Sequence, residues 1–375
     1  MSEQEMGEKL WSMLQKRRAA VKQRAPIAGP WMVYGAGGMG RKMAAELIKA
    51  GFEVLGFVDK MSTGALVDGL PSWTLLQAQS GAMLGCNMAV GIHNPGVDVD
   101  SVGLSLRETG CSSVWLSRDL VEFLPKLSHC WLEPAAAMHG LSREKLQSVV
   151  DVLSWDAESL GQLGAIMASR WGVGDAGAMR VNAADQYSPK GICPLPKRLR
   201  MIDCGAYVGD SYADLLSKGH VFDAYAGLEP DVENFKSLAK RLAGAPGALA
   251  LPCAAWSGAA MLEFAPDDAA GKIVQGMQGV GIQALGIDES LMGMEPNFIK
   301  MDIEGAEAAA LEGARQTIAL RQPRLAVSSY HSAMDIWNLP IIMRDMLEAG
   351  GGKARVALRS HAQSSFDSVL YAWTE

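Results

Sequence analysis

The segment that most constrains the fold is Met201 to Gly209, M-I-D-C-G-A-Y-V-G, in which a short apolar run ends at an acid and is followed by two glycines. Gly205 and Gly209 enclose a turn that leads into a helical pattern. Glycine lacks a Cβ and tolerates positive φ, so a ligand can approach the backbone of such a turn, and the helix start offers unpaired N–H groups. The segment therefore predicts a strand, a tight ligand-binding loop and a helix.

Two further apolar segments also end at acids. Residues 225–228 lead into Glu229, about 20 residues beyond Gly209, and residues 298–301 lead into Asp302. In a doubly wound sheet, an acid at the end of the second strand lies beside the first loop, where it can accept both hydrogen bonds of a ribose diol. These strand-end acids together predict a nucleoside pocket.

The acid at the first position of the loop indicates which nucleoside is bound. Dinucleotide loops have the pattern G-x-G-x-x-G, whereas this loop has Asp203 at the corresponding first position. A carboxylate there disfavours a diphosphate and favours an ammonium group or a water. The pattern thus predicts S-adenosylmethionine, which offers an adenosine to Glu229, an α-amino group to an acid, and a reactive sulfonium.

The chain around this loop resembles the FkbM family of S-adenosylmethionine-dependent methyltransferases. The most specific matching segment is F-I-K-M-D-I-E-G-A-E at 298–307, because D-x-G-x-x-x-G alone indicates only a methyltransferase-like fold. The other matching segments are D-Q-Y at 185–187, I-D-C-G-A-Y-V-G-D-S at 202–211, E-P at 229–230, Y-H at 330–331, D-I-W at 335–337 and V-L-Y-A at 369–372. They follow the family order across roughly the last half of the chain.

The resemblance implies a class I methyltransferase sheet of seven strands with a reversed last strand. It also implies a set of cofactor-binding residues: Asp203, Gly205, Ala206, Tyr207, Gly209, Asp210, Ser211, Glu229, Pro230 and Asp302. Ala254 and Ala255 follow a predicted strand, where small side chains leave room for a flat ring; they are candidates for the floor under the adenine, and apolar filler explains them equally well. The acceptor that the resemblance implies is a hydroxyl of a carbohydrate, a nucleotide-linked sugar or a related natural product.

Methyl transfer from a sulfonium is an in-line displacement, and a hydroxyl acceptor gains from a base that removes its proton. His331 and Asp302 are the candidate bases, since both follow predicted strands that end at the same edge of the sheet. The alternatives are a hydrogen-bonded structural role for His331 and a helix-capping role for Asp302. No metal is predicted, because neither Asp302 nor Glu304 has a recognised metal-ligand spacing.

The N-terminal half carries a second glycine-rich turn. A predicted strand at 31–34 runs into Gly35-Ala36-Gly37-Gly38-Met39-Gly40, and the next strand ends at Asp59, about 20 residues later. One interpretation places a nucleotide or nucleotide-sugar on Gly35, Gly37, Gly38, Gly40 and Asp59. The other is a Rossmann-like domain in which the turn only packs a helix against a strand.

This second turn also supports an alternative function, that of an NAD(P)-dependent oxidoreductase or a nucleotide-sugar-binding protein. Against the oxidoreductase interpretation, the sequence shows no evident substrate domain that carries an acid for hydride transfer. His93 and Asn94 follow a third predicted strand of this domain at the ligand-binding edge, although a polar pair before a proline is also common in loops.

We expect an α/β protein with two doubly wound Rossmann-like domains. Residues 1–27 form an N-terminal helix, 28–132 a Rossmann-like domain, 133–184 a helical connector and 185–375 the methyltransferase domain. The N-terminal helix presents an apolar stripe that must be covered by the following domain or by the second copy in a homodimer.

Composition excludes some partners. The formal net charge of −7 gives no reason to expect nucleic acid or an anionic membrane surface. No apolar run approaches the ~20 residues of a membrane helix, and the acidic N-terminus does not resemble a signal peptide. Six cysteines without a C-x-x-C pair or metal-ligand spacing indicate reduced thiols, so a cytoplasmic location is expected.

Overall fold

The computed structural model describes residues 2–23, 28–79, 81, 83–134, 140–174, 176–265, 272–274 and 280–375. The chain divides into two compact units, each built around its own parallel or mostly parallel sheet, which confirms the expected α/β class. Unit 1 contains Met1–Arg143, Gly161–Val181 and Ala362–Phe366, and unit 2 contains Glu144–Leu160, Asn182–His361 and Asp367–Glu375. The helical connector expected at 133–184 is not a separate domain in this division, because its helices are distributed between the two units.

The sheet of unit 1 has five parallel strands in the order β3-β2-β1-β4-β5. This is the order of the first five strands in doubly wound dinucleotide folds. The strands are β1 (Trp31–Tyr34), β2 (Val54–Val58), β3 (Ser72–Trp73), β4 (Asn87–Val90) and β5 (Ser113–Leu116). The helices are α1 (Glu3–Gln23), α2 (Gly38–Lys49), α3 (Leu75–Gln79), α4 (Val99–Arg107), α5 (Ser117–Leu120) and most of α7 (Ala157–Trp171).

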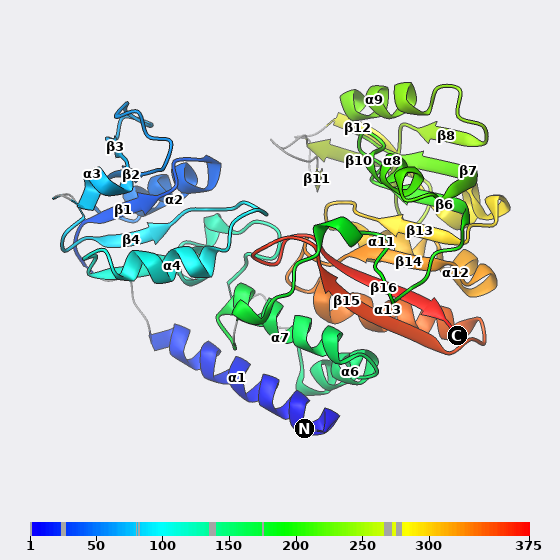
Figure 1. Ribbon diagram of the computed structural model, residues 1–375, viewed down its shortest axis with the longest axis horizontal. Coiled ribbons are helices and arrows are strands. Elements are labelled where there is room, and N and C mark those ends of the chain that lie inside the picture. Colours follow the sequence, from blue (N-terminus) through cyan, green and yellow to red (C-terminus); the bar gives the residue numbers. More distant parts are fainter. Residues whose placement is uncertain are drawn as a thin grey trace. The chain divides into compact units, whose positions relative to one another are not determined.

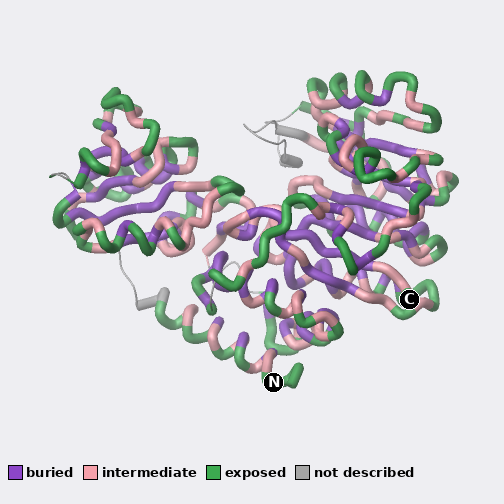
Figure 2. The backbone as a smooth tube through the Cα atoms, in the orientation of Figure 1, coloured by how far each residue is buried: buried purple, intermediate pink, exposed green. Residues whose placement is uncertain are grey.

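The central strands of unit 1 are buried along nearly their whole length, and their burial does not alternate from residue to residue. Strand β1, W-M-V-Y, has three buried residues in sequence, and β4, N-M-A-V, has four. Continuous burial is expected when helices cover both faces of a parallel sheet. Figure 2 shows these strands as buried purple tube between more exposed helices.

The main sheet of unit 2 has seven strands in the order β15-β16-β14-β13-β6-β7-β8. Strand β16 runs antiparallel to both β14 and β15, so the predicted reversed last strand is confirmed. Figure 1 shows the strands in this order, from β8 in green to β15 in red-orange. Their bounds are β6 (Arg198–Cys204), β7 (Val221–Leu228), β8 (Ala248–Leu251), β13 (Phe298–Met301), β14 (Arg324–Ser328), β15 (Ala354–Ser360) and β16 (Ser368–Thr374).

The other elements of unit 2 surround this sheet. The helices are α6 (Arg143–Leu153), the first turn of α7, α8 (Asp210–Ser217), α9 (Val232–Leu242), α10 (Ile287–Ser290), α11 (Glu307–Glu312), α12 (Arg315–Arg321) and α13 (Asp335–Ala349). A second sheet has the order β11-β10-β12-β9, formed by β9 (Ala254–Ala255), β10 (Ala260–Ala265), β11 (Lys272–Val274) and β12 (Val280–Leu285). The glycine-rich segment 271–286 predicts only a loop or hairpin from sequence, and part of that segment lies outside the described residues.

The segment around the start of α7 satisfies backbone groups of β15, which is an edge strand of the main sheet. The Trp155 indole Nε1–H donates to the carbonyl of Val356 at 2.7 Å, and the backbone N–H of Leu358 donates to Ser159 Oγ at 2.9 Å. These two contacts satisfy one C=O and one N–H of an edge strand, whose unpaired groups would otherwise favour association with another chain.

Among the described helices, none combines the length and the apolar character needed to cross a bilayer.

Candidate functional site

The glycines of the loop after β6 are required by the backbone itself. Gly205 has φ +73°, and a Cβ built on it would lie 2.0 Å from the carbonyl oxygen of Asp302. Gly209 has φ +80° and caps α8, where a Cβ would lie 2.7 Å from Arg241 Cδ. Residues with side chains disfavour these angles and cannot fit these contacts. The predicted tight loop is therefore present, and it ends at a helix N-terminus.

A cavity of about 350 Å³ lies in unit 2 beside this loop. Its size falls within the range of about 300–1,000 Å³ typical of small-molecule sites. Nine predicted cofactor residues line it: Gly205, Tyr207, Asp210, Ser211, Glu229, Pro230, Ala254, Ala255 and Asp302. The other lining residues are Gln186, Tyr187, Leu228, Asn234, Lys300, Ile303, Glu304, Ala306 and Asp367.

Glu229 lies at the end of β7 and is held against the glycine loop. Its Oε2 accepts a hydrogen bond from the Tyr207 backbone N–H at 2.9 Å, and its Oε1 accepts one from the Asp231 N–H at 2.8 Å. Burial raises the pKa of Glu229, and the two backbone hydrogen bonds oppose that rise. Each carboxylate oxygen has a second lone pair, so Glu229 can accept two further hydrogen bonds from a ligand.

Asp203, Ala206 and Gly209 were predicted to contact the cofactor, but they are not among the residues that line the cavity. The Asp203 carboxylate is fully buried, 3.0 Å from Lys300 Nζ, and accepts a hydrogen bond from the Tyr225 hydroxyl at 2.7 Å. Asp203 pairs with Lys300 because the parallel register of β6 and β13 sets the two residues side by side. The ammonium group that Asp203 binds is thus one of the protein's own.

Lys300 joins this buried pair to the loop. Its Nζ donates a hydrogen bond to the Gly205 carbonyl at 2.6 Å and lies 5.3 Å from the centre of the Tyr187 ring. Burial by itself would lower the pKa of Lys300, but the Asp203 and Asp302 carboxylates raise it above its ordinary value. Lys300 therefore stays charged, and its hydrogen bond to the Gly205 carbonyl holds the glycine loop in place.

Asp302, at the end of β13, does line the cavity. Its Oδ2 accepts a hydrogen bond from the Tyr187 hydroxyl at 2.8 Å. Burial alone would raise the pKa of Asp302, but Lys300 and His331 hold it below its ordinary value. Asp302 is therefore a carboxylate at neutral pH.

His331 is buried behind Asp302 and is not among the lining residues. Its Nδ1 lies 2.7 Å from Glu307 Oε1, and its Nε2 lies 3.4 Å from Asp302 Oδ1 and 3.6 Å from Glu304 Oε2. Burial would lower the pKa of His331, but the surrounding carboxylates, Glu307 foremost, raise it to about 10. His331 is thus an imidazolium at neutral pH, a state that cannot accept a proton from an acceptor.

Asp302, Glu307 and His331 present ligand atoms within 4.8 Å of one another, a spacing that could hold a metal ion. A metal there would have to displace the proton that His331 shares with Glu307. In the observed contacts both carboxylates already lie against one cation, the His331 ring.

Asp367 lines the cavity, and sequence reasoning did not identify it. Burial and the nearby Asp302 carboxylate raise the pKa of Asp367 to about 6, and a hydrogen bond from the Tyr330 hydroxyl opposes the rise. A signal was present: Asp367 directly precedes the reversed strand β16, whose start must lie at the edge where the parallel strands end. Asn234 is a further lining residue that was not predicted, whereas Gln186 and Tyr187 belong to the D-Q-Y segment that the family resemblance places at the cofactor pocket.

The glycine turn of unit 1 has a similar local geometry. Asp59 Oδ2 accepts a hydrogen bond from the Ala36 N–H at 2.8 Å, which parallels the bond from Tyr207 to Glu229. Gly40 is required by packing, since its Cβ would lie 1.9 Å from the Gly35 carbonyl oxygen. A Cβ on Gly37 or Gly38 would meet nothing within 4 Å. This geometry is compatible with both interpretations of the turn.

A seven-stranded sheet with one reversed strand, an acid on the glycine loop and a ligand-sized cavity at the strand ends together define a class I methyltransferase fold. Residues 203–353 match the family model described as "Methyltransferase FkbM domain". This segment is therefore an FkbM methyltransferase domain, the protein is a methyltransferase, and its cofactor is S-adenosylmethionine.

The chain is similar in fold to the crystal structure of the methyltransferase FkbM from Methylobacillus flagellatus KT, with 21% sequence identity and a TM-score of 0.76. The similarity covers 99% of this chain and 100% of that one. Aeropyrum pernix fibrillarin, solved with natively bound S-adenosyl-L-methionine, is more remote: 10% identity, a TM-score of 0.32, and coverage of 49% of this chain and 71% of that one. No curated protein sequence is similar enough to the chain to count as a relative.

Proposed function

We propose that the protein transfers the methyl group of S-adenosylmethionine to a hydroxyl of a small acceptor, a sugar or a related natural product. The observation that carries the proposal is the charge of the cavity. Its lining contains five carboxyl groups, those of Asp210, Glu229, Asp302, Glu304 and Asp367, and one ammonium group, that of Lys300. Lys300 is already paired with Asp203, so the lining has a net negative charge that complements a cationic methyl donor.

The cofactor-binding residues follow from the positions of the carboxylates. Glu229 accepts both hydroxyls of the ribose, since each of its oxygens has a lone pair beyond the one used by the loop. Ala254 and Ala255 leave a shallow apolar surface for the adenine. Gly205, Asp210 and Asp302 would hold the methionine part, whereas Asp203 supports the loop through Lys300 and does not line the cavity.

When bound, S-adenosylmethionine supplies an electrophilic methyl group on a positively charged sulfur. The chain must align the acceptor oxygen with that methyl and remove the hydroxyl proton as the oxygen–carbon bond forms. Asp302 and Asp367 are the candidate proton acceptors, because both line the cavity and Asp302 is held as a carboxylate. Asp367 suits the task better, since its pKa of about 6 lies near neutrality.

His331 has a positioning role in this mechanism instead of the role of base. Its protonated ring donates to Glu307 from Nδ1 and faces Asp302 and Glu304 with Nε2. A fixed cation at this point lowers the pKa of Asp302 and holds the Glu304 carboxylate nearby.

A hydroxylated acceptor is supported by polar side chains in the lining. The Gln186 amide and the Asn234 amide can both donate to and accept from hydroxyl groups of an acceptor. The resemblance to the FkbM family favours a carbohydrate or a related natural product as the acceptor.

The test is methyl transfer from isotopically labelled S-adenosylmethionine to a panel of mono- and disaccharides, hydroxylated polyketides, amines and thiols. We expect label in a methyl ether of a hydroxylated acceptor, identified by mass spectrometry and by NMR of the new O–CH₃ group. Asp367→Asn should bind S-adenosylhomocysteine as the wild type does and lose turnover. Label only on nitrogen, carbon or sulfur would overturn the proposal, and so would full turnover in both Asp367→Asn and Asp302→Asn.

A further inference from the structure

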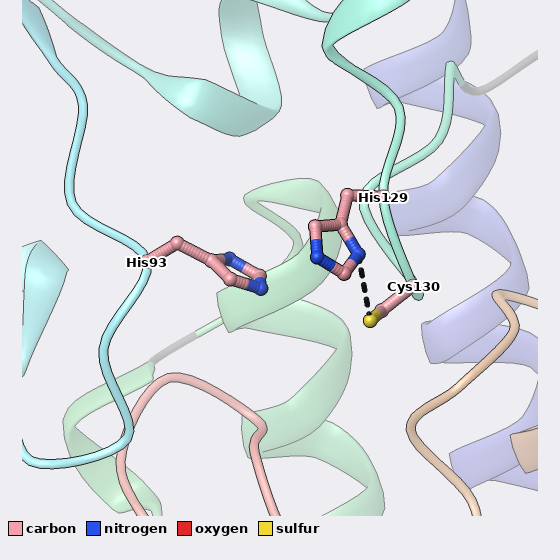
Figure 3. Close-up of side chains that lie close together, drawn as sticks. All are labelled: His93, His129 and Cys130. Atoms are coloured by element: carbon pink, nitrogen blue, oxygen red, sulfur yellow. Dashed lines mark hydrogen bonds between the residues drawn. The ribbon is translucent and has the colours of Figure 1, made fainter. Parts of the chain in front are cut away.

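Two histidines and a cysteine from distant parts of unit 1 meet in space. His93 follows β4, whereas His129 and Cys130 lie in a turn after the short 3-10 helix at Pro125–Leu127. Figure 3 shows the three side chains pointing toward one another from two separate loops. One ligand atom of each residue lies within 4.8 Å of those of the other two.

The turn at 129–132 holds two of these groups as a pair. The His129 N–H donates to the Leu132 carbonyl at 3.0 Å, and the Leu132 N–H donates to the His129 carbonyl at 2.8 Å. Cys130 takes φ +49° inside this turn, in a region that residues with side chains rarely adopt. Its Sγ consequently lies 2.9 Å from His129 Nδ1, the contact drawn as a dashed line in Figure 3.

His93 is fixed by aromatic rings on several sides. Its ring centre lies 4.5 Å from that of Phe366, 5.4 Å from that of Trp131 and 4.8 Å from that of His129. These contacts orient the imidazole and exclude much of the water around it, as the apolar shell of a metal site does.

We propose that His93, His129 and Cys130 form a binding site for a divalent transition metal ion of the zinc type, with a fourth coordination position open to water. Two imidazole nitrogens and one thiolate are a donor set that zinc prefers, whereas magnesium and calcium require oxygen ligands.

The spacing of the donor atoms agrees with this ion. Zn–N bonds of about 2.0 Å and a Zn–S bond of about 2.3 Å separate tetrahedral donor atoms by roughly 3.5 Å. The candidate donor atoms all lie within 4.8 Å of one another, and Cys130 Sγ lies 2.9 Å from His129 Nδ1, so the three side chains are already gathered at about the distance that such an ion requires. On binding, the Cys130 thiol loses its proton to solvent and forms the sulfur–metal bond.

The site is separate from the methyltransferase chemistry, because all three ligands belong to unit 1 and none lines the cavity of unit 2. Its consequence is structural: the ion would connect the loop after β4 to the 129–132 turn and so close a long segment of chain. Binding that requires the folded loops stabilises the folded state by mass action.

The test uses the full-length chain without a histidine tag, stripped of metal with a chelator and kept reduced with a phosphine. Cobalt(II) is titrated first, since it occupies zinc sites and reports its ligands by absorption. We expect one equivalent of cobalt to bind, with a thiolate-to-cobalt charge-transfer band in the near ultraviolet and strong visible bands of four-coordinate geometry. One equivalent of zinc should remove both signals.

Matched variants assign the thiolate and the imidazole. Cys130→Ser should abolish the charge-transfer band, and His129→Gln, at an exposed position that cannot disturb the core, should weaken zinc affinity by about 10- to 100-fold. Cys111→Ser is the control, because Cys111 is another partly exposed thiol of the same unit and should leave the band unchanged.

Zinc should also raise the midpoint of thermal unfolding in the wild type and in Cys111→Ser, but not in Cys130→Ser. Absence of the charge-transfer band in the wild type, or its persistence in Cys130→Ser, would overturn the proposal. Zinc binding of equal strength in wild type, Cys130→Ser and His129→Gln would also overturn it and would direct attention to Asp302, Glu307 and His331 instead.

Discussion

Replacing Glu229 with glutamine tests the position of the cofactor most directly. Both carboxylate oxygens already accept a backbone N–H, from Tyr207 and from Asp231, and the proposal assigns their other lone pairs to the ribose. A glutamine has one acceptor oxygen, and its NH₂ group would face a backbone donor. Hydrogen bonds to charged groups contribute about 1.5–3 kcal/mol each, so we expect a loss of about 3 kcal/mol in binding.

That loss corresponds to about 100-fold weaker affinity for S-adenosylhomocysteine, measured by isothermal titration calorimetry. The matched control is Asp59→Asn in unit 1. Asp59 accepts backbone N–H groups from Ala36 and Met61, each at 2.8 Å, so the amide disturbs a comparable pair of bonds away from the cavity. Its affinity should stay within about twofold of the wild type.

Circular dichroism must show that both variants are folded before the affinities are compared. Equal binding by Glu229→Gln and the wild type would refute the assignment of the ribose to Glu229. Loss of binding in Asp59→Asn alone would move the nucleoside to the glycine turn of unit 1.

Three further predictions concern pH and backbone strain. The pKa of His331 is raised from 6.5 to about 10, so its contribution to stability is fully present below 6.5 and disappears as the pH rises through about 10. His331→Gln should remove this pH dependence and destabilise the protein by about 3 kcal/mol in urea unfolding, because Glu307 loses its buried cation. Asp367 has a pKa of about 6, so wild-type turnover should fall as the pH drops through that value; Asp367→Asn should lower kcat by about 100-fold and lose this limb of the profile. Gly205→Ala, at φ +73°, should cost about 3 kcal/mol in thermal unfolding, whereas Gly37→Ala should stay within about 0.5 kcal/mol.

The fold of the C-terminal half was predictable because its constraints are local in sequence. Gly205 and Gly209 adopt the positive φ that the motif predicted, and Glu229 and Asp302 end strands at one edge of the sheet. Strand ends and turn glycines can be recognised from a few neighbouring residues, without knowledge of the rest of the fold. The reversed strand β16 followed from the family resemblance and is confirmed by its antiparallel pairing.

The roles of individual side chains were less predictable because they depend on register and burial. Asp203 was expected to face the cofactor, but its strand register places it beside Lys300. His331 was a candidate base, and only the fold shows that a buried Glu307 lies 2.7 Å from its ring. Asp367 was missed although it directly precedes the reversed strand β16, because the sequence analysis did not consider which side chains the start of a reversed strand brings to the ligand-binding edge.

The methyltransferase unit is assembled from three stretches of chain, Glu144–Leu160, Asn182–His361 and Asp367–Glu375. A fragment that begins at residue 185 would therefore lack Trp155 and Ser159, which complete the hydrogen bonding of β15. An expression boundary placed at 185 would therefore cut through the packing of the unit itself, and a shorter version of this protein has to retain Glu144–Leu160 to keep its edge strand covered.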